Sequence, residues 1–157
     1  MARPATSGRA LATRSLLLPR TPRCVRDARA HVREDLAATA LPDGAIEDVL
    51  LVVSELVSNS LRHARPLPGD DAVALRWDCD EASVVVRVTD GGGPTFPRAR
   101  PPATSALGGR GLAMVAAVSA DWGVERAAGQ VTVWAVVAAD DAVTTTDRLG
   151  GARSQRG

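Results

Sequence analysis

Hydrophobic positions recur with the spacing of helices and strands from about residue 12 to residue 139. Between Ile46 and Ala64 they return every three or four residues, which is the period of one helical face. Shorter runs such as "AVALRWDC" (72–79) are rich in apolar and aromatic residues and predict strands. The elements predicted in this way are a strand at 12–20, helices at 21–40, 43–63 and 111–120, and strands at 72–79, 82–90, 121–126 and 129–139.

The order of these elements predicts the fold class. It reads strand, two helices, hairpin, helix, hairpin, and a single sheet with every helix on one face would bury all the apolar stripes together. We therefore predict an α+β fold in two layers, with a mixed, mostly antiparallel sheet and three helices on one face. Thr21 and Asp43 are the predicted N-caps of the first two helices.

Length, charge and cysteine usage exclude several classes of protein. The chain has 157 residues, which is the length of one domain. Its net charge of +1 creates no strong electrostatic potential that would attract nucleic acid or an anionic membrane. No apolar run approaches the roughly 20 residues of a membrane span, so we expect a cytoplasmic protein. Cys24 and Cys79 are isolated and are expected to be reduced interior thiols. The domain is placed at 11–140, between a disordered start (1–10) and a flexible tail (141–157).

The segment "SELVSNSLRHA" (54–64) carries a polar stripe on an otherwise apolar helix. Glu55, Asn59 and His63 are four residues apart and so share one face. A carboxylate in a partly dry wall can act as a general base, and a carboxamide oxygen can complete the ligand shell of Mg²⁺. A polar stripe at a solvent boundary would give the same pattern.

The segment "VVVRVTDGGGP" (84–94) brings Asp90 to the end of a strand and follows it with three glycines. Glycine runs are costly in conformational entropy, so they indicate backbone that passes very close to something. A carboxylate there can accept a hydrogen bond from an amino group such as that of adenine, or it can cap its own loop.

The segment "GGRGLAMV" (108–115) places glycines immediately ahead of a helix. Free backbone N–H groups and the positive end of the helix dipole suit a phosphate. No Lys and no Ser or Thr follows the glycines, so this is not a Walker A loop, and the glycines do not follow a strand, so this is not a dinucleotide fingerprint. Tight packing at the helix entry is the alternative explanation.

These three motifs, in this order along the chain, resemble those that form the nucleotide site of the ATPase superfamily that includes gyrase B subunits and sensor histidine kinases. The segments "VSELVSNSLRHA", "VTDGGGP", "GGRGLAMV" and "DWGV…GQVTVWAVV" are most similar to the short stand-alone branch of anti-sigma factor serine kinases, over about Arg14 to Ala139. The resemblance implies the histidine-kinase-like ATPase fold.

The resemblance also implies a role for each matching position. Glu55 would be the catalytic base, Asn59 would coordinate Mg²⁺ and Asp90 would bind the adenine amino group. Gly92 would let the base approach, and the segment from Pro94 to Ala106 would be a lid. The phosphates would be held at the helix start by Gly109, Arg110, Gly111 and Leu112. Pro94 departs from the DxGxG pattern common in the superfamily.

The function implied by this resemblance is that of an ATP- and Mg²⁺-binding regulatory protein. It would be a serine/threonine kinase that phosphorylates a small partner, namely an anti-sigma factor antagonist of the STAS type, with a sigma factor as a further partner. A homodimer is expected, and direct contact with nucleic acid or a membrane is not. The Pro94 departure keeps a second hypothesis open, a non-catalytic switch that sequesters a sigma factor or another regulator. A third hypothesis is a protein that keeps the fold without binding nucleotide.

Overall fold

The computed structural model of the chain describes residues 12–94 and 110–140. The predicted disordered start and flexible tail therefore lie outside the described residues. The same holds for Gly109 and for the predicted lid beyond Pro94.

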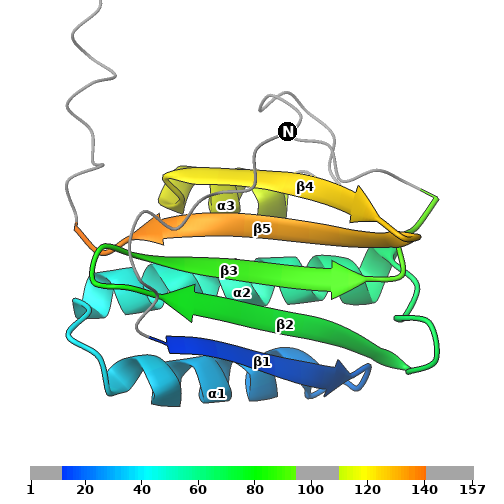
Figure 1. Cartoon of the computed structure of the whole chain (residues 1–157), viewed down its shortest axis with the longest axis horizontal. Helices are drawn as coiled ribbons and strands as arrows, with labels where there is room; N and C mark the ends of the chain where they lie inside the picture. The colour runs from blue at the N-terminus through cyan, green and yellow to red at the C-terminus, as the bar shows by residue number, and fades with distance from the viewer. Residues whose placement is uncertain (1–11, 95–109, 141–157) are drawn as a thin grey trace, which may run out of the picture.

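Five described strands form one sheet in the order β1-β2-β3-β5-β4 (Figure 1). Each neighbouring pair is antiparallel. The α+β prediction is confirmed, and the described sheet is antiparallel throughout. The strands are β1 (Ala12–Pro19), β2 (Ala72–Cys79), β3 (Ser83–Asp90), β4 (Asp121–Ala127) and β5 (Gln130–Ala138).

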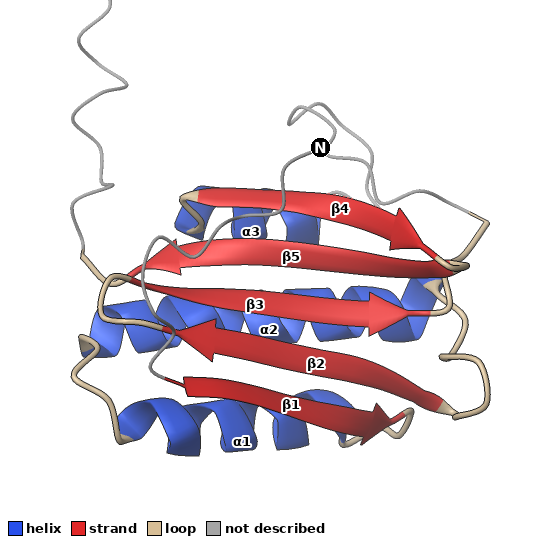
Figure 2. Ribbon diagram, in the orientation of Figure 1, coloured by secondary structure: helices blue, strands red, loops and turns tan. Residues whose placement is uncertain are grey.

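The three described helices cover one face of this sheet (Figure 2). They are α1 (Cys24–Ala37), α2 (Asp43–His63) and α3 (Arg110–Val118). In Figure 1, α1 lies behind β1, α2 behind the centre of the sheet and α3 behind β4. The core between the two layers is built from the apolar stripe of α2 and the inward side chains of the strands, among them Val49, Leu50, Val53, Leu75 and Val86. No helix in the described ranges is both long and apolar enough to cross a membrane.

The two predicted helix caps are wrong by two residues for α1, whose cap position is Arg23, and by one residue for α2, whose cap position is Pro42. Thr21 does not cap α1, because a turn precedes the helix and the N–H of Cys24 donates to the Thr21 carbonyl at 3.0 Å. Asp43 is already the first residue of α2, and Pro42 occupies the cap position in an extended conformation. The Asp43 carboxylate still lies in the first helical turn, where it faces the positive end of the helix dipole.

Both cysteines are free and buried, as predicted. Burial raises the pKa of the Cys24 thiol and the pKa of the Cys79 thiol above their ordinary value.

The sheet face that points away from the helices holds a buried carboxylate, Asp78. It accepts hydrogen bonds from Thr13 Oγ1 at 2.7 Å and from Arg76 at 3.1 Å, and it pairs with Arg87. Burial by itself would raise the pKa of Asp78. The hydrogen bonds from Thr13 and Arg76 and the charge of Arg87 outweigh it, so the pKa lies below its usual value.

Candidate functional site

Helix α2 presents Glu55 and Asn59 to the first turn of α3. A methyl group added at Gly111 would collide with Oε2 of Glu55, and it would lie 3.9 Å from Nδ2 of Asn59. Both polar side chains are half-buried. The first and third sequence motifs, which are far apart along the chain, therefore meet at this point.

The first residues of α3 differ in burial. Leu112 is 5% exposed and belongs to the core, whereas Arg110 is exposed. The first N–H groups of a helix have no partner within the helix. Because Gly111 carries no side chain, its backbone lies close to the Glu55 carboxylate. This arrangement suits an anion and equally requires glycine for tight packing.

The second motif forms a closed turn at the end of β3. Asp90 is 6% exposed, and its Oδ1 accepts a hydrogen bond from the N–H of Gly92 at 2.8 Å. The carboxylate therefore caps its own loop, as one of the two sequence interpretations expected. A carboxylate has about four acceptor positions, so this one bond does not use up the acceptor capacity of Asp90.

The three glycines after Asp90 are explained by the backbone that leaves α2. Methyl groups added at Gly91 and Gly93 would collide with the carbonyl oxygens of Pro66 and His63. Gly92 has a φ of 73°, which favours glycine. The sequence predicted a close approach here, and the neighbour is the protein's own chain.

Two backbone hydrogen bonds fix this contact. The N–H of Arg65 donates to the Gly92 carbonyl at 2.7 Å, and the N–H of Gly91 donates to the Arg65 carbonyl at 2.9 Å. The position of the loop after Asp90 is therefore set by the segment that follows α2.

All three motifs thus lie along one stretch of α2. Gly111 contacts the helix at Glu55 and Asn59, and Gly93 contacts it at His63. The two contacts are four to eight residues apart, which corresponds to about 6–12 Å along the helix axis at 1.5 Å per residue. The roles predicted for the individual side chains remain predictions.

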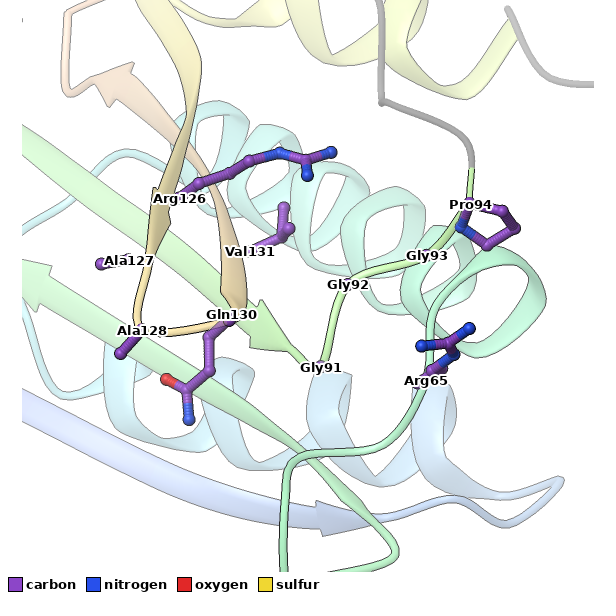
Figure 3. Close-up of a pocket in the computed structure, with 11 residues that line it drawn as sticks. Arg65, Gly91, Gly92, Gly93, Pro94, Arg126, Ala127, Ala128, Gln130 and Val131 are labelled. Atoms are coloured by element: carbon purple, nitrogen blue, oxygen red, sulfur yellow. The ribbon is translucent and has the colours of Figure 1, made fainter.

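A pocket of about 370 Å³ opens between the glycine loop and the β4–β5 hairpin (Figure 3). Gly92 lines it, while Glu55, Asn59 and Asp90 do not. Its charged lining residues are Arg65 and Arg126. The remaining lining residues are Gly91, Gly93, Pro94, Ala127, Ala128, Gly129, Gln130 and Val131.

The two arginines of the pocket come from different parts of the chain. Arg65 follows α2 and lines the pocket, whereas the nearby Arg62 donates to the Ser58 carbonyl of its own helix at 3.3 Å. Arg126 was missed. It pairs with Val131 in the hairpin register, and since Val131 belongs to the core, both side chains point toward the helix layer (Figure 3). Strand register, once predicted, is the signal that could have found it.

A family comparison agrees with this geometry. The profile described as the histidine kinase-like ATPase domain matches residues 18–137. The chain belongs to the histidine kinase-like ATPase domain family. Membership of an ATPase family implies nucleotide binding, and it confirms the resemblance stated from the sequence motifs.

Two solved structures share the fold of this histidine kinase-like ATPase domain. One is the crystal structure of the RsbU and RsbW domains of Rv1364c from Mycobacterium tuberculosis, with a TM-score of 0.62 and 22% identity. The match covers 80% of this chain and 32% of the Mycobacterium tuberculosis chain, so this chain spans about a third of the length of that protein. The other is the SiaB-SiaC complex from Pseudomonas aeruginosa, with a TM-score of 0.55, 16% identity, and coverage of 83% and 91%. At these identities the likeness shows the fold alone. No curated protein matches the chain.

Proposed function

We propose that this domain binds ATP with Mg²⁺ and transfers the γ-phosphoryl group to a serine or threonine hydroxyl of a small regulatory partner. The observation that carries the proposal is that Gly111, at the start of α3, lies against the Glu55 carboxylate with Asn59 nearby. It joins a carboxylate, a carboxamide and a helix N-terminus, which are the groups that a magnesium triphosphate and its acceptor hydroxyl need.

The residues present suit the metal as well as the nucleotide. The Asn59 oxygen is a hard ligand of the kind Mg²⁺ prefers, and Asn59 would hold the ion against the phosphates. When bound, Mg²⁺ would neutralise charge on the phosphate oxygens. Asp90, at the end of β3 beside the glycine loop, would accept a hydrogen bond from the adenine amino group.

The acceptor step would be carried by the side chain next to the phosphate site. The partner hydroxyl oxygen forms a new bond to the γ-phosphorus while the bond to the β,γ-bridging oxygen breaks, and ADP leaves. Glu55 would take the hydroxyl proton. The N–H groups at Gly111 and its neighbours would bind the transferring group, so most of the rate would come from positioning and electrostatics.

The partner class rests on the family and on the fold neighbours. The sequence motifs resemble those of anti-sigma factor serine kinases. A protein of the same fold, SiaB, is crystallised in a complex with SiaC. We therefore place an anti-sigma factor antagonist of the STAS type first among candidate partners, with a sigma factor second.

The test is phosphoryl transfer from labelled ATP to candidate antagonists. Glu55→Gln should abolish label on the partner while calorimetry still shows ATP binding. Asn59→Ala should lose the magnesium-dependent part of that binding. Glu47→Gln is a matched control, because Glu47 lies on the same helix and pairs with Arg33 at 3.2 Å, at the surface. Its transfer rate should stay at the wild-type level.

Three outcomes would contradict the proposal in different ways. Wild-type transfer by Glu55→Gln would remove the proposed base. If the protein binds ATP and the partner but transfers no label, the non-catalytic switch is favoured. Pro94, which departs from the family pattern and lines the pocket, is the residue that motivates this alternative. An absence of binding heat for ATP with Mg²⁺ would mean that the fold is kept without its nucleotide.

A further inference from the structure

Arg20 is bound to the end of α2 although it lies far from it in sequence. It follows β1 and precedes α1, and its side chain is 19% exposed. Its guanidinium donates to the Leu61 carbonyl at 2.9 Å and to the Ala64 carbonyl at 3.0 Å, with a longer bond to Ser60 at 3.5 Å. A guanidinium therefore binds three carbonyls at the C-terminus of α2.

These bonds replace the usual helix ending. The last carbonyls of a helix have no partner within it, and a glycine after the helix commonly satisfies them. Here the residue after His63 is Ala64, in an extended conformation with a φ of −114°. A positive charge at this end is also favoured by the helix dipole. Arg20 thus fixes where the chain leaves α2.

The same exit segment holds the glycine loop. Arg65, one residue beyond the Ala64 carbonyl that Arg20 binds, exchanges two backbone hydrogen bonds with Gly91 and Gly92. His63 and Pro66 leave no room for a side chain at the glycines they face. A shift of the exit segment would therefore move the loop that closes on Asp90.

We propose that Arg20 is a positioning residue for the Asp90 loop and so for the adenine end of the nucleotide site. The inference rests on the proposed function for its ligand. A guanidinium that only stabilised α2 would change the stability of the protein and leave the loop unaffected. A positioning role requires that the loop loosens and that ATP affinity falls in a protein that is still folded.

The experiment compares the wild type with Arg20→Met, which keeps an unbranched apolar stem but has no donors, and with Arg20→Lys. Amide hydrogen exchange at Arg65 and Gly91 is followed by NMR, and the Kd for ATP with Mg²⁺ is measured well below the melting temperature. In Arg20→Met we expect exchange at both amides to accelerate and the Kd to rise, each on the order of tenfold. Arg20→Lys should recover part of both effects, because an ammonium can still donate to one or two carbonyls.

Two controls separate positioning from stability. Arg14→Met removes an arginine of β1, the strand that precedes Arg20. The Arg14 Nε donates to Asp35 of α1 at 3.1 Å, and the substitution should leave the glycine loop unchanged. Val32→Ala makes a cavity under α1 and should lower stability without raising the Kd. The proposal is overturned if Arg20→Met exchanges at the wild-type rate at both amides, or if Val32→Ala raises the Kd as much. If the wild type binds no ATP, the proposed function is refuted. The amide exchange rates at Arg65 and Gly91 would still show whether Arg20 positions the loop.

Discussion

Replacing Gly111 by alanine would place a methyl group where the Glu55 carboxylate lies. The added carbon would collide with Oε2 and would stand 3.5 Å from Cδ of the same carboxyl group. Oε2 is the far end of a flexible side chain, so the Glu55 carboxylate can move away while the backbone of α3 stays in place. The perturbation is therefore directed at one functional group.

The expected magnitudes differ sharply for stability and for chemistry. Restoring normal contact requires a displacement of roughly 1 Å. Moving the Glu55 side chain out of its preferred rotamer lowers stability by about 0.5–1.5 kcal/mol. Alanine in place of a helical glycine raises stability by up to about 1 kcal/mol. The net change in the free energy of unfolding should stay within about 1 kcal/mol. A catalytic group misplaced by roughly 1 Å loses on the order of a hundredfold in rate.

The assay is a double-mutant cycle with Glu55→Ala. Urea titrations give the free energy of unfolding for the four proteins, and labelled ATP gives the transfer rate for Gly111→Ala against wild type. With the carboxylate removed, Gly111→Ala should become stabilising by up to about 1 kcal/mol. The difference between the two backgrounds measures the clash, with an expected coupling of about 0.5–1.5 kcal/mol.

Either of two results would refute this reasoning. Equal stability changes in both backgrounds would show that the methyl group and the carboxylate do not meet. An unchanged transfer rate in Gly111→Ala would show that the position of Glu55 does not matter to the reaction.

Three further substitutions test how the fold is held. Ser60→Ala should raise the free energy of unfolding by about 1 kcal/mol, because the buried Ser60 hydroxyl has no hydrogen-bond partner among the described residues; a loss in urea titrations would contradict this. Ala128→Gly should stabilise by about 0.5 kcal/mol, since Ala128 has a φ of 52° that glycine adopts without strain; a lower melting temperature would count against it. Asp78→Asn should destabilise by about 1–3 kcal/mol at neutral pH, because it disrupts the interactions with Thr13 and Arg87. The folded pKa of Asp78 lies below its unfolded value, so this stabilisation is present above about pH 4 and is lost as the pH falls through the folded pKa. Stabilities of wild type and variant measured against pH should therefore converge in acid, and a constant gap would be inconsistent with the shift.

The elements of the fold could be predicted because each is specified locally. The helical period of the α2 segment and the apolar runs of the strands predicted all eight described elements, with ends within a few residues. The helix starts could not be fixed as well. Thr21 and Asp43 are both good caps by residue type, but the turn before α1 and the extended Pro42 before α2 shift the first helical residue.

The candidate site was predicted as three separate motifs, and their meeting was an inference from family resemblance. The residue types at Glu55, Asn59 and Asp90 limit the chemistry, since a carboxylate and a carboxamide have few roles where they are shielded from solvent. Nothing in the local sequence states that Gly111 contacts Glu55. Arg126 was missed for the same reason, because its place at the pocket depends on the register of a hairpin.

The sequence by itself determined the order of the elements, the face that each buries and the polar groups available for chemistry, because periodicity and residue type act within a few residues of the chain. Only the tertiary structure decided what the glycines face: His63 and Pro66 for Gly93 and Gly91, and Glu55 for Gly111. The room for a Cβ atom and the partner of a helix-end carbonyl are set by atoms distant in sequence and close in space.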